Sequence, residues 1–184
     1  MRIGYIVGSL AQHSINRRLA TALSGLAPEG VEFVEISIAD LPLYSWDQDA
    51  DFPAAALDFK EAVAGVDGVL FLTPEYNRSI PAALKNAIEW GSRPWGQSVW
   101  GGVPAGVIGT SPGSTGTAMA QQHLRNILAH LDMRVLGQPE AFVQAREGAI
   151  AATGEIQDDS LRAVLQGYVD ALVAHVDAAA RVAA

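Results

Sequence analysis

The sequence contains no cysteine, and this absence excludes several classes of protein at once. Disulfide scaffolds, iron–sulfur clusters, thiolate zinc sites, covalent c-type haem and cysteine nucleophiles all need a residue that the chain lacks. A cysteine-free chain also fits a reducing compartment, so we expect a cytoplasmic location.

Positive charge is scarce as well. Twelve lysines and arginines stand against 20 aspartates and glutamates, which gives a formal net charge of −8. Without a basic stripe, nucleic acids and anionic membranes are not expected as partners. No uncharged apolar stretch reaches 18 residues, and the apolar run after Met1 has no cleavage site behind it. We therefore expect neither a membrane span nor a signal peptide.

Apolar residues make up 49% of the 184 residues and charged residues 17%, which excludes intrinsic disorder. A chain of this length can bury one core, so we expect residues 1–184 to form a single domain.

Short β-rich runs alternate with longer segments of helical periodicity. The short runs are apolar throughout, which is typical of parallel strands covered by helices on both faces. They lie at residues 3–7, 31–36, 69–72 and 103–108, with a weaker fifth in 134–143 that Gly137 and Pro139 interrupt. Helical patterns cover residues 14–26, a segment from Pro53, a segment from Pro81 to Gly91, residues 117–131, and residues 161–176, with 144–158 as a polar loop.

This alternation predicts right-handed βαβ units, and therefore a doubly wound α/β sheet. In such sheets the ligand lies beyond the carboxyl ends of the strands, where the strand order reverses. The loops after the first, third and fourth strands should therefore hold the site.

The loop after the first strand combines a tight turn with small polar residues. Gly8 permits the turn, while Ser9, Ser14 and Asn16 lead into the amides of a helix N-terminus, which suits a phosphate-sized anion. Neither the P-loop spacing nor Gly-x-Gly-x-x-Gly is present. The alternative interpretation is that Ser14 only caps the helix.

The loop after the third strand runs from Thr73 to Pro81 and contains two prolines. It predicts a stiff wall that presents backbone amides and the ring of Tyr76 to a flat ligand. Alternatively, Tyr76 covers the edge of the core and Glu75 is solvated.

The loop after the fourth strand, residues 110–117, contains two glycines that let the backbone approach a ligand closely. Ser111, Ser114 and Thr115 can form hydrogen bonds with carbonyl or ring-nitrogen edges. The alternative is a flexible turn capped by Thr117.

Two segments carry a resemblance to a known family: Gly8-Ser9-x-x-x-x-Ser14-x-Asn16, and the run from Thr73-Pro74-Glu75-Tyr76-Asn77 to Glu89-Trp90. They resemble the NADPH-dependent FMN reductases, especially the soluble bacterial quinone, chromate and azo-dye reductases. The similarity extends to residues 122–128 and 153–156. It implies a flavodoxin-like five-stranded parallel sheet of order 2-1-3-4-5, with helices on both faces and FMN at the switch point.

The resemblance also implies a set of FMN-binding residues. The first loop would hold the phosphate, the third would line the isoalloxazine ring largely through backbone groups, and the fourth would close the other edge of the ring. The set is Ser9, Ser14, Ile15 and Asn16; Pro74, Glu75, Tyr76 and Asn77; and Ser111, Gly113, Ser114 and Gly116.

One position departs from the family pattern. Relatives usually carry arginine two residues after the first serine, where this chain has Ala11. A charge-assisted contact to phosphate contributes about 1.5–3 kcal/mol. We therefore expect weaker FMN binding unless Arg17 or His13 supplies the missing charge.

The implied activity is transfer of hydride from NADPH or NADH to flavin N5, and then reduction of a quinone or a similar small acceptor such as chromate, an azo dye or free flavin. No acid–base residue is required. Arg78 is a candidate contact to coenzyme or acceptor, and the alternative is a solvated surface arginine. Because relatives complete the flavin site with a neighbouring subunit, we expect a homodimer or homotetramer.

Two other functions compete with this one. A flavodoxin-type electron carrier would not turn over nicotinamide, but its Thr/Ser-x-Thr-Gly-x-Thr loop is absent. A binding or regulatory protein that has lost tight FMN binding is the other alternative, and Ala11 supports it.

Several histidines and tryptophans need an interpretation as well. His123 and His130 share a helix face without carboxylate support, so we expect a surface or subunit contact and no metal site. Trp46, Trp95 and Trp100 are expected in polar loops that flank the site.

Overall fold

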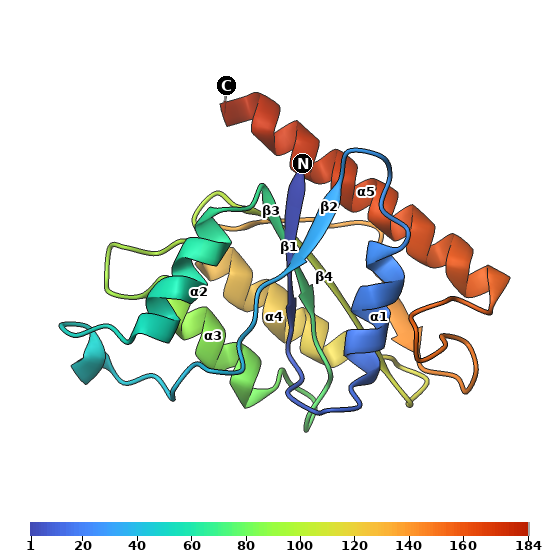
Figure 1. The fold of residues 1–184 in the computed structure, drawn as a ribbon, viewed down its shortest axis with the longest axis horizontal. Coiled ribbons are helices and arrows are strands. Elements are labelled where there is room, and N and C mark those ends of the chain that lie inside the picture. Colours follow the sequence, from blue (N-terminus) through green and yellow to red (C-terminus); the bar gives the residue numbers. More distant parts are fainter. Residues whose placement is uncertain (184) are drawn as a thin grey trace.

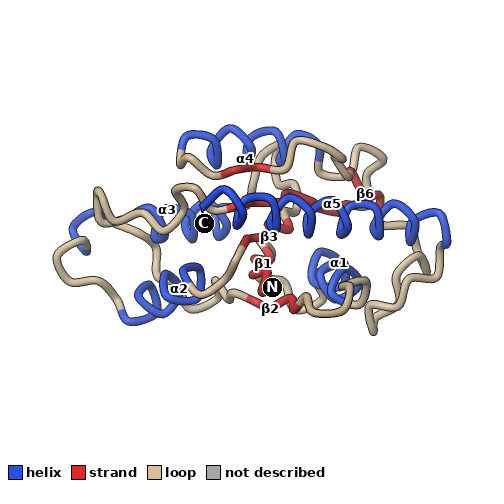
Figure 2. Tube along the Cα trace, turned by 90° about the horizontal axis from the view of Figure 1, so that it is seen from above, coloured by secondary structure: helices blue, strands red, loops and turns tan. Residues whose placement is uncertain are grey.

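The computed structural model describes residues 1–183. A twisted parallel sheet lies between two layers of helices (Figures 1 and 2). The strands are β1 (Arg2–Val7), β2 (Glu32–Glu35), β3 (Gly68–Leu72), β4 (Pro104–Ser111), β5 (Arg134–Val135) and β6 (Phe142–Gln144). Their order is β2-β1-β3-β4-β5, and every pairing between them is parallel. The predicted fold class and strand order are therefore confirmed.

The predicted fifth strand is two strands in the structure, not one. β5 pairs with the start of β4, and β6 pairs with the last three residues of β4. Between them the chain leaves the sheet around Pro139, which has no N–H to donate to a strand partner. Arg125 fills part of this gap, since its Nη1 donates to the Leu136 carbonyl at 2.6 Å. Gln144, predicted as the start of a loop, is the last residue of β6.

Five α-helices cover the two faces of the sheet. They are α1 (Ile15–Ser24), α2 (Ala54–Ala64), α3 (Ala82–Ser92), α4 (Ala118–His130) and α5 (Asp159–Ala183), with a short 3₁₀ turn at Trp46–Gln48. The core between α1, α5 and the sheet includes Leu19, Leu70 and Tyr168. The core on the other face packs α3 and α4 against the sheet through residues such as Leu84 and Leu124.

Trp100 corrects one prediction, because it lies in this second core and not at the rim of the site. Its ring is fully buried between Phe59 and Phe71, with centroids 6.0 and 5.8 Å away. Gly91 makes room for it, since a Cβ there would lie 2.4 Å from the ring. Trp46 and Trp95 are exposed, as expected of loop residues.

Asp158 begins α5 by capping it. Its Oδ1 accepts hydrogen bonds from the Ser160 N–H at 2.9 Å and from the Leu161 N–H at 3.0 Å, as well as from the Ser160 hydroxyl. These bonds, the hydroxyl first, hold the pKa of the Asp158 carboxyl below its usual value. This cap explains why α5 begins before the predicted residue 161.

The cap predicts a pH dependence of stability. A carboxyl whose pKa is depressed by folding stabilises the protein above its unfolded pKa, and that contribution is lost as the pH falls through the folded pKa. Asp158→Ala should therefore be less stable than the wild type at pH 7, and the difference should shrink below about pH 4. Urea unfolding across pH measures this. Asp159→Ala, which changes the neighbouring carboxyl, is the control and should show a smaller difference at pH 7.

Candidate FMN site

The loops after β1, β3 and β4 leave the sheet at one edge, the lower edge in Figure 1. The Gly8 N–H donates to the Leu72 carbonyl at 2.8 Å, and the Thr73 N–H donates to the Ile108 carbonyl at 2.9 Å. The three loops therefore begin side by side. They do so where the strand order reverses, which is where α/β sheets bind ligands.

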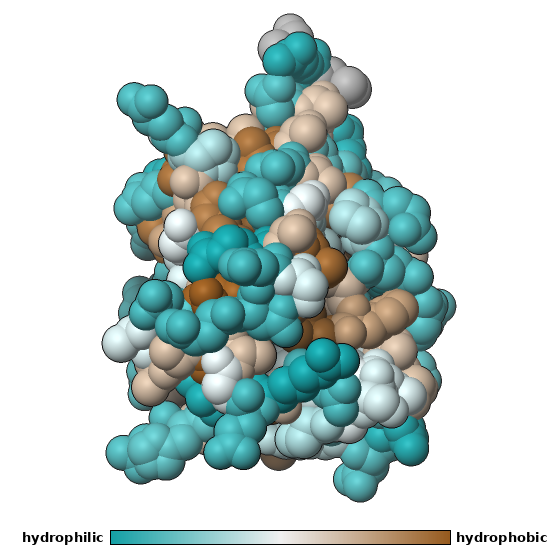
Figure 3. All heavy atoms as spheres, turned by 90° about the vertical axis from the view of Figure 1, so that its right-hand side faces the viewer, coloured by the Kyte–Doolittle hydropathy of each residue, from teal (hydrophilic) through white to brown (hydrophobic). Residues whose placement is uncertain are grey.

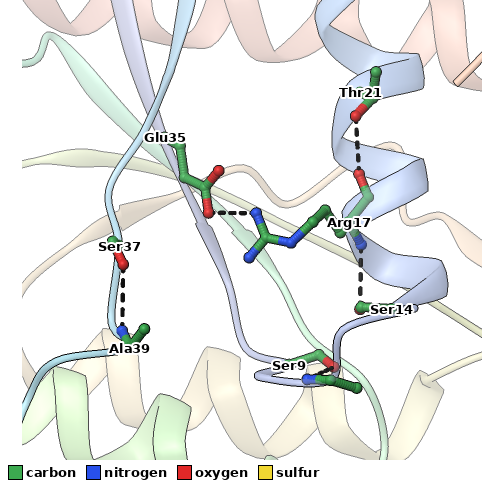
Figure 4. Close-up of polar contacts among 8 residues, drawn as sticks. Ser9, Ser14, Arg17, Thr21, Glu35, Ser37 and Ala39 are labelled. Carbon is green, nitrogen blue, oxygen red and sulfur yellow. Dashed lines mark hydrogen bonds and ion pairs between the residues drawn. The ribbon is translucent and has the colours of Figure 1, made fainter. Parts of the chain in front are cut away.

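The loop between β1 and α1 presents donors at a helix N-terminus. Ser9 and Ser14 are both buried. The Ser14 hydroxyl accepts from the Arg17 N–H at 3.3 Å, so it does cap α1 (Figure 4). Within the described chain, the N–H groups of Ile15 and Asn16 make no hydrogen bond. Free amides at a helix N-terminus suit a phosphate group.

The side chain of Asn16 is already engaged elsewhere. Its Nδ2 donates to the Thr110 carbonyl at 3.0 Å, and its Oδ1 accepts from the Thr110 N–H at 2.9 Å. Asn16 is 1% exposed. This pair of bonds fixes the start of α1 to the end of β4, so Asn16 can offer a phosphate its backbone N–H while its side chain holds the loop in place.

Arg17, a cation in the first turn of α1, is paired with Glu35. Nη1 of Arg17 lies 2.5 Å from Oε1 of Glu35 at the end of β2, and Figure 4 shows the guanidinium directed away from Ser9 and toward that carboxylate. Burial raises the pKa of Tyr5, and the charge of Glu35 adds to this effect. Because Arg17 is paired with Glu35, it can supply the charge that is missing at Ala11 only if this ion pair breaks.

The loop between β3 and α3 ends in a tight hairpin. Tyr76 and Ser79 exchange two backbone hydrogen bonds of 3.0 Å, and the residues between them, Asn77 and Arg78, have φ of 52° and 64°. Positive φ at both central positions is typical of a type I′ turn. The hairpin presents the ring of Tyr76, which is 52% exposed, as a rigid wall.

Glu75 anchors this hairpin to α4. Its Oε2 accepts from the N–H groups of Met119 and Ala120 at 3.1 and 3.3 Å, and its Oε1 pairs with Arg78 at 3.2 Å. The side chain is 8% exposed, so the alternative of a solvated Glu75 is wrong. Glu75 also supplies the cap that the side chain of Thr117 does not make. Arg78 remains largely exposed despite its ion pair.

The loop between β4 and α4 is held by its own side chains and by close backbone contacts. The Ser111 hydroxyl donates to the Gly116 carbonyl. Gly116 has φ of 57° and lies against Phe142, whose carbonyl carbon would be 2.7 Å from a Cβ. Before the loop, in the last part of β4, Gly109 lies against the Thr73 carbonyl, whose oxygen would be 2.0 Å from a Cβ. The alternative of a turn capped by the Thr117 side chain is wrong, although residues 112–115 at the tip of the loop are exposed.

The two histidines of α4 lie in different surroundings. Nδ1 of His123 is 2.9 Å from the Ser79 hydroxyl, which ties α4 to the hairpin a second time. His130 lines a hollow of about 670 Å³ between α3 and α4. Among residues 1–183, no group of three or more His, Cys, Asp and Glu could hold a metal ion. In the same range, none of the helices has the length and apolar character needed to cross a bilayer.

Curated proteins of similar sequence include several reductases. Residues 1–148 match the family of NADPH-dependent FMN reductases. The 2-hydroxy-1,4-benzoquinone reductase of a Burkholderia species is 50% identical over 176 residues, which cover 96% of each chain. The quinone reductase of Escherichia coli K12 is 38% identical over 175 residues, which cover 93% of each chain.

Solved structures agree with this assignment. FerB of Paracoccus denitrificans, a flavoenzyme NAD(P)H:(acceptor) oxidoreductase, superposes with a TM-score of 0.92 at 44% identity, covering 96% of this chain and 97% of that one. A flavodoxin variant from Pseudomonas aeruginosa has a TM-score of 0.57 at 21% identity, covering 94% of this chain and 99% of that one, which shows the shared fold. The chain belongs to the NADPH-dependent FMN reductase family.

Proposed function

We infer that the protein is an FMN-dependent NAD(P)H oxidoreductase that reduces quinones or similar small acceptors. The observation that carries this function is the meeting of three loops at the switch point, one of them with free amides at a helix N-terminus. Relatives at 38–50% identity that are quinone reductases support it. The likeness to flavodoxin is one of fold alone, which leaves the electron-carrier alternative with less support.

The residues at the three loops fit FMN. The phosphate would meet the hydroxyls of Ser9 and Ser14 and the N–H groups of Ile15 and Asn16. The ring would lie against one hairpin wall and one glycine-containing loop. These are Pro74, Glu75, Tyr76 and Asn77 on one side, and Ser111, Gly113, Ser114 and Gly116 on the other.

Bound FMN supplies the redox chemistry, as the acceptor of hydride from NAD(P)H and the donor to the second substrate. The protein's own part is to bind and orient. Glu75 holds the hairpin against α4 through Met119 and Ala120, so the wall beside the ring is fixed before any substrate arrives. Arg78, exposed at the hairpin tip, is proposed as a contact for coenzyme or acceptor.

An anaerobic half-reaction tests the function. We would mix FMN-loaded protein with excess NADPH, and in parallel with NADH, and follow flavin absorbance by stopped flow. Rapid bleaching is expected, with the yellow colour restored when benzoquinone is added. Protein that stays yellow would instead be an electron carrier, and protein that does not retain FMN would be a binding or regulatory protein.

Ser14 should matter for FMN more than for riboflavin, because only FMN carries the phosphate. Ser14→Ala removes the helix cap, at a cost of about 1 kcal/mol in stability. It also removes a donor to a charged group, which should weaken FMN binding by about tenfold and leave riboflavin binding nearly unchanged. Flavin fluorescence quenching measures both affinities. Ser24→Ala, which removes a hydroxyl at the other end of α1, should change neither, and equal losses for the two flavins would contradict the placement of the phosphate.

We also propose a cytoplasmic homodimer or homotetramer. The 670 Å³ hollow between α3 and α4, with the exposed ring of Trp95 at its edge, supports an interface on that face. Light scattering at micromolar concentration should give a mass of two or four chains. A monomeric mass would count against the proposal.

A further inference from the structure

A small cavity lies beside the first turn of α1, with Ile15 and Arg18 in its lining. Its walls come from the start of α1, the end of β4 and the segment 143–150. Its volume is about 40 Å³, which is room for about three water molecules or one phosphoryl group. Figure 3 views this side of the molecule, where apolar atoms lie between hydrophilic side chains.

Thr110 lines this cavity with a buried hydroxyl. Its Oγ1 has no hydrogen-bond partner within the described residues, and the residue is 2% exposed. The Asn16 side chain binds both the N–H and the carbonyl of Thr110, which fixes the backbone of this residue beside the cavity. A buried hydroxyl left without a hydrogen-bond partner destabilises the folded state. A group inside the cavity would satisfy it.

Two arginines line the same cavity. Arg18 of α1 and Arg146 make neither an ion pair nor a side-chain hydrogen bond in the part of the chain that the structure describes. By contrast, Arg17, Arg78 and Arg125 pair with glutamates. Guanidinium groups match the oxygen geometry of phosphate and carboxylate, and here two of them face one space in a protein of net charge −8.

One acid lies near this pair of arginines. Asp158 is close enough for the charge of Arg146 to contribute to its lowered pKa. However, its carboxylate is committed to capping α5, and it lines a neighbouring hollow and not the cavity itself. The two arginines are therefore the charged residues of a lining that is otherwise largely apolar, with Thr110 and Gln144 as its uncharged polar members.

Two larger hollows share lining residues with the cavity and also include residues of the candidate FMN loops. One, of about 330 Å³, shares Arg146 with the cavity and extends to Ser114 of the loop after β4. The other, of about 440 Å³, shares Arg18 and extends to Ser14. An anion between the arginines would thus have two larger hollows beside it, each lined in part by a residue of the candidate FMN loops.

We propose that Arg18, Arg146 and Thr110 form a second anion site, which takes a phosphomonoester group. Two sources have this chemistry: the 2′-phosphate of NADPH, and free inorganic phosphate. The first source rests on the proposed function, because the 2′-phosphate is the group that distinguishes NADPH from NADH. Its occupation would make this cavity the determinant of coenzyme preference.

The test compares FMN-loaded wild type with the double variant Arg18→Gln, Arg146→Gln. FMN loading keeps the probes out of the FMN phosphate site. Thermal unfolding is measured with inorganic phosphate and with 2′,5′-ADP, and kcat/KM with benzoquinone is measured for NADPH and NADH. The control variant is Arg181→Gln, which removes one positive charge at the far end of α5.

A 2′-phosphate site predicts that 2′,5′-ADP raises the unfolding temperature of the wild type but not of the double variant. In that case kcat/KM for NADPH falls tenfold or more, while the value for NADH stays within twofold. A free-phosphate site predicts that inorganic phosphate has the same stabilising effect as 2′,5′-ADP, lost in the double variant, with an unchanged NADPH to NADH ratio. The second anion site is overturned if neither probe stabilises the wild type, or if the double variant and the Arg181→Gln control respond as the wild type does.

A further variant keeps the test independent of folding defects. Thr110→Val removes the unpartnered hydroxyl and keeps the shape of the side chain, so without added anion it should be at least as stable as the wild type. With 2′,5′-ADP or phosphate its stabilisation should be smaller. An unchanged response would remove Thr110 from the site.

The bleaching assay separates failure of this second anion site from failure of the proposed function. Loss of flavin bleaching with both coenzymes would count against the proposed function, whereas selective loss with NADPH would not.

Discussion

Gly109→Ala is expected to open the candidate site and destabilise the whole protein. A Cβ at this position would lie 2.0 Å from the carbonyl oxygen of Thr73 and 2.4 Å from Oγ1 of Thr117. The first of these atoms belongs to the backbone and cannot rotate away, so the ends of β3 and β4 must separate. We expect a loss of about 3 kcal/mol or more in the free energy of unfolding. Urea denaturation measures this loss.

The same substitution should release FMN, because the two strand ends carry the hairpin wall and the glycine-containing loop. Gel filtration followed by flavin absorbance measures how much FMN stays bound. Gly167→Ala is the control, since nothing lies within 4 Å of a Cβ in that part of α5. It should stabilise the helix by about 0.5–1 kcal/mol and retain FMN fully. If Gly109→Ala behaves in the same way, the close approach of β3 and β4 at the site is wrong.

Asn16→Asp should have the second largest effect. The substitution replaces the donor to the Thr110 carbonyl with a carboxylate oxygen, in a position that is 1% exposed. A buried charge facing a carbonyl, with its donor lost, should cost about 2–4 kcal/mol of stability at pH 7. FMN affinity should fall too, because the first turn of α1 is no longer fixed to β4.

The pH dependence of this variant separates its cause from general damage. Burial beside a carbonyl raises the pKa of the introduced carboxyl, and its protonated form can again donate to Thr110. The deficit relative to the wild type should therefore shrink as the pH falls from 7 to 5, as chemical denaturation at each pH will show. Gln157→Glu, which makes the same amide-to-acid change at an exposed residue, should cost little at any pH. A deficit of constant size would mean that the Thr110 bonds are not what Asn16 contributes.

Much of the fold follows from patterns in the sequence. The apolar runs at residues 3–7 and 69–72 are strands because they are buried on both faces, and continuous hydrophobicity is the local mark of such burial. The interruption of the fifth strand follows from Pro139, although a sequence cannot tell whether the chain returns to the sheet. It returns as β6 because the last residues of β4 still have free hydrogen-bonding groups.

The site was predictable at the level of loops and less so at the level of side chains. Small polar residues and glycines at strand ends indicate where a ligand lies. They do not show that the Asn16 side-chain amide forms hydrogen bonds with Thr110, 94 residues away, or that Glu75 caps α4. The prediction that Trp100 flanks the site is wrong for the same reason. Glycines follow this residue directly at Gly101 and Gly102, and the space that buries its ring comes from Gly91 on another element.

The two outer strands of the sheet bear on how copies of the protein can meet. β2 has four residues and carries a glutamate at each end, while the opposite border is divided between β5, with two residues, and β6, with three. Short or charged borders are poor templates for adding a strand from another molecule. Continuous sheets running through several subunits, and the fibrous aggregates that begin in that way, are therefore disfavoured, and any assembly of this chain must use the outer surfaces of its helices and loops.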